Sequence, residues 1–176
     1  MSYLNGMKKR FSSDVVKNPD PATDLSIPPL KGVYVLLLRL ETPLKTSIGF
    51  LGPVELPCGI YAYVGSARGP GGLRARVSRH LGKVKSLKWH IDYVTSSPQA
   101  RIEALVYAET LEDLEAPISM KLGNSLCFKY SLKGFGSTDK RSETHLFKCM
   151  CSLEECVREA SKTLQEFNLK VKTCKL

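Results

Sequence analysis

The sequence has no apolar run long enough to cross a membrane. Its longest candidate, residues 33–38, is followed by Arg39 and Glu41, whereas a spanning helix needs about 20 apolar residues. The first eleven residues are polar and contain no hydrophobic segment of the kind that secretory signals carry. We therefore expect a cytoplasmic protein without a membrane partner.

Acidic residues are also scarce. The 176 residues include 26 Lys and Arg against 17 Asp and Glu, which leaves a net charge of +9. Such an excess favours polyanions, because basic side chains displace the counterions that surround nucleic acids. The charge by itself fits a generically basic soluble protein equally well, so the choice depends on motifs.

Cysteine is present six times, but the context argues against a disulfide framework. Without an export signal, these side chains are expected to be reduced thiols. His145, Cys149, Cys151 and Cys156 are close together in the sequence. However, one residue separates Cys149 from Cys151, whereas structural zinc sites usually have about two to four. This spacing argues against zinc.

Length and patterning predict one domain with two tails. Prolines make residues 1–29 an irregular lead-in, the domain is expected over 30–147, and residues 148–176 form a C-terminal amphipathic helix and tail. Ser152 and Glu155 have the spacing of a capping box that opens this helix. The predicted elements are strands over 31–40, 59–67 and 102–107, a hairpin within 41–58, and helices over 73–84, 113–122 and 152–167.

A glycine-rich turn joins the second predicted strand to a basic helix. Residues 65–72 read Gly-Ser-Ala-Arg-Gly-Pro-Gly-Gly. Such turns let backbone amides approach a phosphate, and the helix dipole that follows favours an anion. No Gly-Lys-Ser/Thr closes the turn, so it is not a Walker loop. An ordinary flexible turn is the alternative.

The helix after this turn carries Arg76 and His80 on one side, since they are four residues apart. Arginine offers a planar fork that suits phosphate oxygens, and histidine exchanges protons near neutral pH. The alternative is a solvated basic face on a helix whose core stripe is Leu73, Val77 and Leu81.

Tyrosines and carboxylates supply two further candidate groups. Tyr61 and Tyr63 point to the same face of the second strand, and Tyr34 lies on the first. A tyrosine can position water or phosphate, although its pKa near 10 requires nearby cations before it acts as a base; core packing is the alternative. One carboxylate is sufficient to hold magnesium beside substrate oxygens, and a solvated helix face is the alternative. The carboxylates of this segment are Glu103, Glu109, Glu112, Asp113 and Glu115.

Taken together, these segments resemble the GIY-YIG nuclease superfamily, most closely its stand-alone prokaryotic (archaeal-type) branch of formerly uncharacterised proteins. The match covers roughly residues 30–147. The literal triplet Gly59-Ile60-Tyr61 adjoins the second motif and leaves no room for two strands and a turn, so we interpret it as a decoy. The matching pieces, in order, are Gly32-Val33-Tyr34, Tyr63-Val64-Gly65, Gly65-Ser66-Ala67, residues 73–77 with Arg76, Arg79-His80, residues 89–93, and Phe135-Gly136-Ser137.

The resemblance implies an α+β fold with a small three-stranded antiparallel central sheet flanked by helices, a hairpin insertion and a C-terminal helix. It implies that Tyr34 acts as general base on water, that Tyr63 positions the phosphate or water, and that Arg76 stabilises the phosphate charge. It further implies that His80 assists proton transfer. One Mg²⁺ (or Mn²⁺) would be held by Glu115, with Glu112 as second choice.

The implied activity is metal-dependent hydrolysis of DNA phosphodiester bonds by an endonuclease, as in DNA repair or recombination. Two alternatives stay open: an inactive nucleic-acid-binding module with the same fold, and a protein-interaction scaffold that uses the C-terminal helix. In the inactive module, a basic stripe that adds Lys85 and Lys88 would follow the phosphates. The residues expected to contact DNA are Ser66, Arg68, Arg74, Arg79, Lys83 and His90.

Overall fold

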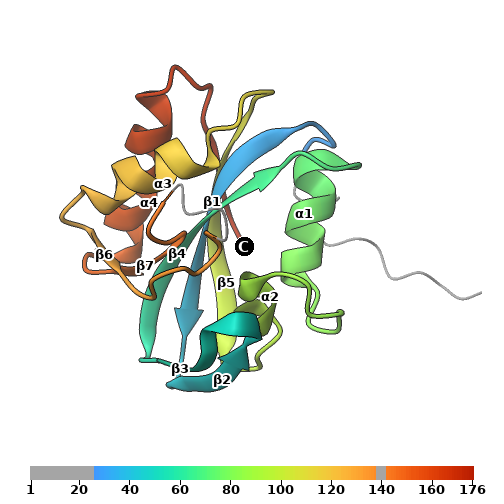
Figure 1. Cartoon of the computed structure of the whole chain (residues 1–176). Helices are drawn as coiled ribbons and strands as arrows, with labels where there is room; N and C mark the ends of the chain where they lie inside the picture. The colour runs from blue at the N-terminus through green and yellow to red at the C-terminus, as the bar shows by residue number, and fades with distance from the viewer. Residues whose placement is uncertain (1–25, 138–141) are drawn as a thin grey trace, which may run out of the picture.

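A computed structural model of the chain describes residues 26–137 and 142–176. Most of the predicted lead-in over 1–29 therefore lies outside the described residues. A six-stranded antiparallel sheet forms the centre, in the order β6-β7-β4-β1-β5-β8 (Figure 1). Its strands are β1 (Gly32–Leu40), β4 (Gly59–Ala67), β5 (Ala100–Glu109), β6 (Phe128–Tyr130), β7 (Leu146–Cys149) and β8 (Lys172–Lys175).

The predicted three-stranded sheet is wrong. The expected strands β1, β4 and β5 form its middle, but β7 and β6 extend it beyond β4, and β8 extends it beyond β5. These added strands have three or four residues each. Such short segments carry too little alternation to be recognised, and they become strands because they pair with distant parts of the chain.

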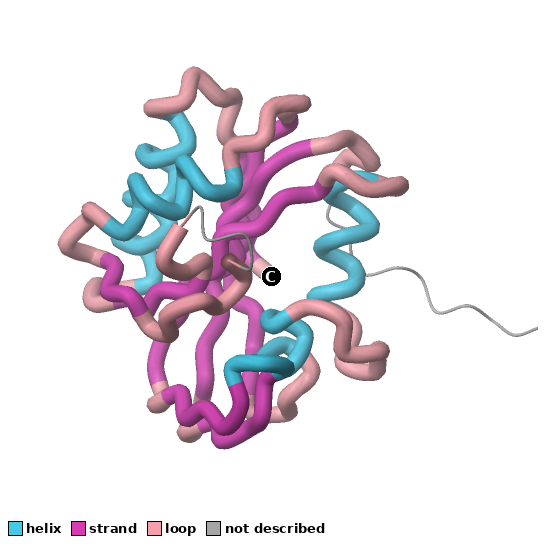
Figure 2. Tube along the Cα trace, viewed as in Figure 1, coloured by secondary structure: helices cyan, strands magenta, loops and turns pink. Residues whose placement is uncertain are grey.

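A separate two-stranded sheet occupies the segment where the sequence predicted a hairpin. Strands β2 (Leu44–Ile48) and β3 (Gly52–Leu56) pair in antiparallel fashion through a 3₁₀ turn at Gly49–Leu51. The hairpin lies beside α2 (His90–Thr95), a short helix that the sequence patterns did not reveal (Figures 1 and 2).

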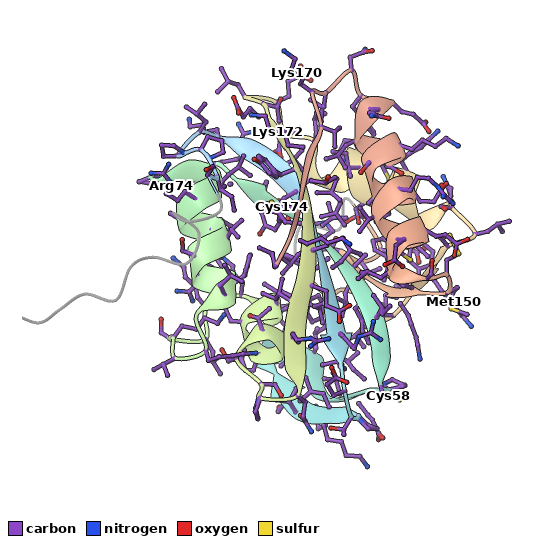
Figure 3. The ribbon with its side chains drawn as sticks, turned by 180° about the vertical axis from the view of Figure 1, so that it is seen from behind. Cys58, Arg74, Met150, Lys170, Lys172 and Cys174 are labelled. Atoms are coloured by element: carbon purple, nitrogen blue, oxygen red, sulfur yellow. A yellow bond between two sulfur atoms is a disulfide. The ribbon has the colours of Figure 1, made fainter. Side chains whose placement is uncertain are left out.

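Helices cover both faces of the central sheet, which explains the continuous apolar run in β1. Leu36 packs on one face with Leu73 of α1 (Gly72–Leu81) and with α2. Val35 packs on the other face with Ile118 of α3 (Glu115–Gly123) and with Ala160 of α4 (Leu153–Gln165). Viewed from behind, α1 and α4 lie on opposite sides of β5, and β8 runs along it with Cys174 (Figure 3). A strand covered on both faces has no reason to alternate apolar and polar residues.

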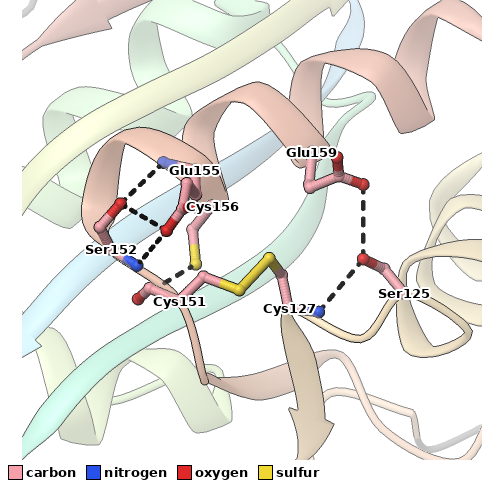
Figure 4. Close-up of a disulfide and its surroundings, with 7 residues drawn as sticks. All are labelled: Ser125, Cys127, Cys151, Ser152, Glu155, Cys156 and Glu159. Atoms are coloured by element: carbon pink, nitrogen blue, oxygen red, sulfur yellow. Dashed lines mark hydrogen bonds between the residues drawn. A yellow bond between two sulfur atoms is a disulfide. The ribbon is translucent and has the colours of Figure 1, made fainter.

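One disulfide contradicts the expectation of reduced thiols throughout. Cys127, just before β6, is bonded to Cys151, just before α4, with the two Cα atoms 5.2 Å apart (Figure 4). Cys58, Cys149, Cys156 and Cys174 remain free. The partners are 24 residues apart, and only the pairing of β6 with β7 brings them together.

No helix within 26–137 and 142–176 combines the length and the apolar character that crossing a membrane requires.

Candidate active site

A hollow of about 310 Å³ opens beside the central sheet, where α1, α2 and α3 approach β1 and β4. It gathers predicted site residues that are up to 81 positions apart in the sequence, from Tyr34 to Glu115. His80 does not line the hollow, but it is buried and contacts Tyr34. The hollow is lined by Tyr34, Tyr63, Ser66, Arg76, Lys88, Trp89, His90, Glu115 and Gly136.

The two tyrosine motifs meet because β1 and β4 are neighbours. Their register places Tyr34 opposite Gly65. A Cβ atom at position 65 would lie 2.4 Å from the Tyr34 hydroxyl, so only glycine lets this ring lie across β4. Tyr61, of the triplet interpreted as a decoy, instead donates a hydrogen bond to the Pro57 carbonyl at 2.6 Å, and it does not line the hollow.

Tyr34 and His80 form a buried hydrogen-bonded pair, with 2.7 Å between the Tyr34 hydroxyl and His80 Nε2. Burial, followed by the positive charges of Lys85 and Arg76, lowers the pKa of His80 to about 3. Its imidazole is therefore neutral at pH 7, and Nε2 accepts the Tyr34 hydroxyl proton only in the tautomer that carries its proton on Nδ1. Burial chiefly, and Tyr63 next, raise the pKa of Tyr34 well above its ordinary value, whereas Arg76 lowers it.

Tyr63 lines the same hollow within a cluster of rings. Its ring centroid lies 6.5 Å from that of Tyr34 and 6.1 Å from that of Phe135. Burial and then Glu115 raise its pKa, and Arg76 lowers it. Both tyrosines are almost fully buried, and both also line the hollow. Packing in the core therefore does not prevent either tyrosine from contacting a ligand in the hollow.

Arg76 presents its guanidinium to the hollow. The group lies 3.9 Å from the centroid of the Trp89 ring, in a cation–π contact. Within the described part of the chain it makes no hydrogen bond or ion pair with an acidic side chain. No acidic side chain of residues 26–137 and 142–176 therefore competes with a ligand for its donors.

Glu115, the first residue of α3, is the carboxylate that lines the hollow. Oε2 accepts a hydrogen bond from the Ser66 hydroxyl, and Oε1 lies 3.1 Å from Nδ1 of buried His145. This distance allows an ion pair when His145 is protonated, but Nδ1 makes no hydrogen bond. Glu112, the second choice, lies exposed in the loop before α3 and does not line the hollow.

Several predicted DNA-contacting groups are engaged inside the protein. Ser66 and His90 do line the hollow, and His90 Nδ1 accepts the Gly136 amide at 3.0 Å. The long basic side chains, in contrast, hold loops and helix ends together. Arg68 donates to the Leu111 carbonyl, Arg74 to the Ile27 carbonyl, Arg79 to Asp92 at 2.7 Å, and Lys83 to the carbonyls of Thr95, Ser97 and Ala100.

The amides that open α1 after the glycine-rich turn are engaged within the chain. At the start of α1, the amide of Leu73 donates to the Leu30 carbonyl at 2.8 Å, and that of Arg74 donates to the Pro28 carbonyl at 3.2 Å. Gly72 and Ala75 donate to carbonyls within the turn. The first-turn donors that usually attract anions are thus used by the chain itself.

Sequence reasoning missed three contributors to the site: His145, Gly136 and the Trp89 ring. In the sequence, His145 is a candidate ligand for zinc only, and Trp89 is only part of a segment that matches the GIY-YIG superfamily. Neither has a local pattern that points to the hollow, because both arrive through loops whose course depends on distant contacts. The lone tryptophan directly after the lysine-rich stretch at 83–88 was the one available signal for an aromatic at a basic surface.

Comparison with known proteins gives one match. A family model described as "Domain of unknown function DUF123" matches residues 33–166, which is more than two thirds of the chain. No curated protein and no solved structure matches.

Proposed function

This chain belongs to the DUF123 family of domains of unknown function, and we propose that it is a metal-dependent endonuclease that hydrolyses DNA phosphodiester bonds. The proposal retains the resemblance to GIY-YIG nucleases in its motifs and site, although not in the size of the sheet. One observation carries it: Tyr34, Tyr63, Arg76 and Glu115 come from four elements to a single hollow. Structural roles alone do not require these groups to meet.

The donor set fits one magnesium ion. Mg²⁺ keeps several waters and is often held by one or two carboxylates plus substrate phosphates, and the Glu115 carboxylate faces the hollow. Among residues 26–137 and 142–176, no group of three His, Cys, Asp or Glu side chains is arranged to hold a metal. A bound Mg²⁺ or Mn²⁺ would neutralise phosphate charge and lower the pKa of its water.

Each side chain of the site would have a separate role in the reaction. Arg76 binds a phosphate oxygen and stabilises the charge that develops on it. Tyr63 orients the phosphate or the attacking water. Tyr34 takes a proton from that water as its own hydroxyl proton passes to His80 Nε2, 2.7 Å away. The incoming phosphate makes His80 more basic, because a nearby negative charge favours the protonated imidazole.

An inactive nucleic-acid-binding module is the second candidate, and the protonation state of the pair favours it. The raised pKa of Tyr34 and the lowered pKa of His80 oppose proton transfer between them in the free protein. A module of this kind would bind DNA with a steep salt dependence and cleave none.

The test is cleavage of supercoiled, branched and single-stranded DNA by the full chain with Mg²⁺ or Mn²⁺. We expect metal-dependent cleavage that Arg76→Ala lowers by about 100-fold or more, the usual effect of removing one donor to a developing charge. Arg158→Ala is the matched control, because Arg158 is exposed on α4 and does not line the hollow.

Two outcomes would overturn the proposal. Salt-sensitive DNA binding without cleavage on any substrate would favour the inactive module. Equal cleavage by Arg76→Ala and Arg158→Ala would show that the hollow is not the active site.

A further inference from the structure

A second hollow, of about 370 Å³, adjoins the first on the side of the glycine-rich turn. The two share Arg76, Lys88 and Trp89, which therefore form a ridge between them. The floor and far wall of the second hollow come from the turn and from the start of α1. Both volumes lie at the lower end of the range for small-ligand pockets, about 300–1,000 Å³.

The ridge is held firmly in place. The Trp89 amide donates to Asp92 Oδ2 at 2.9 Å, and the same buried oxygen accepts from Arg79 at 2.7 Å. The guanidinium carbons of Arg76 and Arg79 lie 3.9 and 4.6 Å from the Trp89 ring centroid. Arg79, which sequence analysis expected to contact DNA, thus orients an aromatic ring through Asp92 while its own charge stays beside the second hollow.

The lining chemistry selects for an anion that carries a flat ring. Arg76, Arg79 and Lys88 are cationic, Trp89 is aromatic, and no carboxylate lines this hollow. Nucleotides have both features, a phosphate and a planar base, and proteins bind single strands through basic grooves with aromatic stacking platforms. The amides at the start of α1 are engaged, so the cationic side chains that line the hollow would hold the phosphate.

We propose that the second hollow binds the nucleotide next to the cleaved phosphodiester, with its base unpaired and stacked against the guanidinium groups that cover Trp89. Its position relative to the reacting phosphate rests on the proposed function. If a DNA strand places one phosphate at Arg76 in the first hollow, its neighbouring nucleotide can enter the second hollow by crossing the ridge. A continuous duplex keeps its bases inside the helix and has to unstack one to fill this space. The substrate is therefore DNA that is single-stranded beside the scissile bond.

Tryptophan fluorescence reports on this site directly, because Trp89 is the only tryptophan in the chain. The full chain is titrated, without metal and with a chelator, with a short single-stranded DNA and with a blunt-ended duplex that contains the same strand. We expect the single strand to quench the Trp89 emission and to bind at least about 5-fold more tightly than the duplex, the lower end of what one stacked base contributes.

Ala75 provides a variant that reaches only the second hollow. It is exposed on α1 and lines that hollow but not the first. Ala75→Leu fills the space, so we expect it to weaken single-strand binding by about 5-fold or more and to remove the quenching. Ala75→Ser is the matched control that leaves the space open. Quenching by the single strand that survives in Ala75→Leu, or equal quenching by the duplex, would overturn the proposal.

The two proposals fail in different ways. Metal-dependent cleavage without any change in Trp89 emission on single-strand binding overturns the nucleotide site and leaves the nuclease. Quenching that Ala75→Leu removes, in a protein that cleaves no DNA, supports the nucleotide site and overturns the nuclease. Absence of both quenching and cleavage overturns both.

Discussion

Arg76 and Glu115 face the same hollow without forming an ion pair with each other. The arginine rests on the Trp89 ring, and the glutamate is oriented by Ser66 and His145. A cation and an anion held apart by other contacts leave room for a ligand that satisfies both. A phosphate bound at the guanidinium and a metal ion bound at the carboxylate would meet that requirement.

Replacing Glu115 with Gln tests the metal ligand. The amide keeps an oxygen for the Ser66 hydroxyl but loses the charge that attracts Mg²⁺. We expect cleavage at limiting Mg²⁺ to fall more than about 10-fold and to recover partly at high Mg²⁺. Glu112→Gln is the matched control, since Glu112 is exposed outside the hollow. The measurement is the cleavage rate of each variant as a function of Mg²⁺ concentration. Identical curves for both variants would exclude Glu115 as the metal ligand.

His80 makes the stability of the fold depend on pH. Its pKa is about 3 in the folded protein and about 6.5 when unfolded, so between these values the unfolded chain binds the extra proton. The free energy of unfolding should fall as the pH drops below about 6.5, by up to about 1.4 kcal/mol per pH unit from this group. The dependence ends near the folded pKa.

His80→Gln should flatten this acid dependence, because glutamine does not titrate. Urea unfolding of both proteins at neutral pH and at about pH 4.5 gives the comparison, and only the change with pH is compared. A variant that loses as much stability on acidification as the natural chain would show that His80 is not the responsible group.

The turn before α1 is the element that connects the site helix to the segment at 27–30. Gly72 has φ +54°, and a Cβ atom there would lie 2.2 Å from the Leu30 carbonyl oxygen. That close approach lets Leu73 and Arg74 donate to Leu30 and Pro28. The glycine-rich sequence therefore serves a backbone junction that sets where α1 begins, and with it the position of Arg76.

Gly72→Ala should strain this junction. We expect a loss of at least about 2 kcal/mol in the free energy of unfolding, from the left-handed backbone and the collision with Leu30. Gly69→Ala is the matched control in the same turn, because nothing lies within 4 Å of its added Cβ atom, and its loss should stay within about 0.5 kcal/mol. Denaturant unfolding measures both, and equal losses would contradict the explanation.

At the scale of the whole molecule, the Cys127–Cys151 disulfide encloses the segment that supplies Gly136 and His145 to the site. It ties the start of β6 to the residue before the capping box of α4 (Figure 4). A covalent link across 24 residues restricts the unfolded chain more than the folded one.

Cys127→Ser should lower the free energy of unfolding by about 3 kcal/mol in non-reducing buffer, and it should differ little from the natural chain in the presence of a reductant. Cys58→Ser is the control, because Cys58 is exposed and free. Thermal unfolding with and without reductant gives the answer. Equal stability of Cys127→Ser and Cys58→Ser in non-reducing buffer would indicate that the disulfide contributes nothing.

Local patterns were sufficient where neighbouring residues decide the outcome. The apolar run at 33–38 became a strand buried on both faces, Leu73 and Val77 became the buried stripe of α1, and Ser152 with Glu155 formed both bonds of a capping box. These features depend on residues a few positions apart, so periodicity and cap chemistry are readable from the chain.

Tertiary structure alone decided the sheet of six strands, the disulfide, and the internal use of Arg74 and Lys83. Each depends on groups that meet from distant parts of the chain. The local sequence does not distinguish a basic side chain that faces solvent from one that caps a helix. Which of the two it does depends on the carbonyls that folding brings within reach.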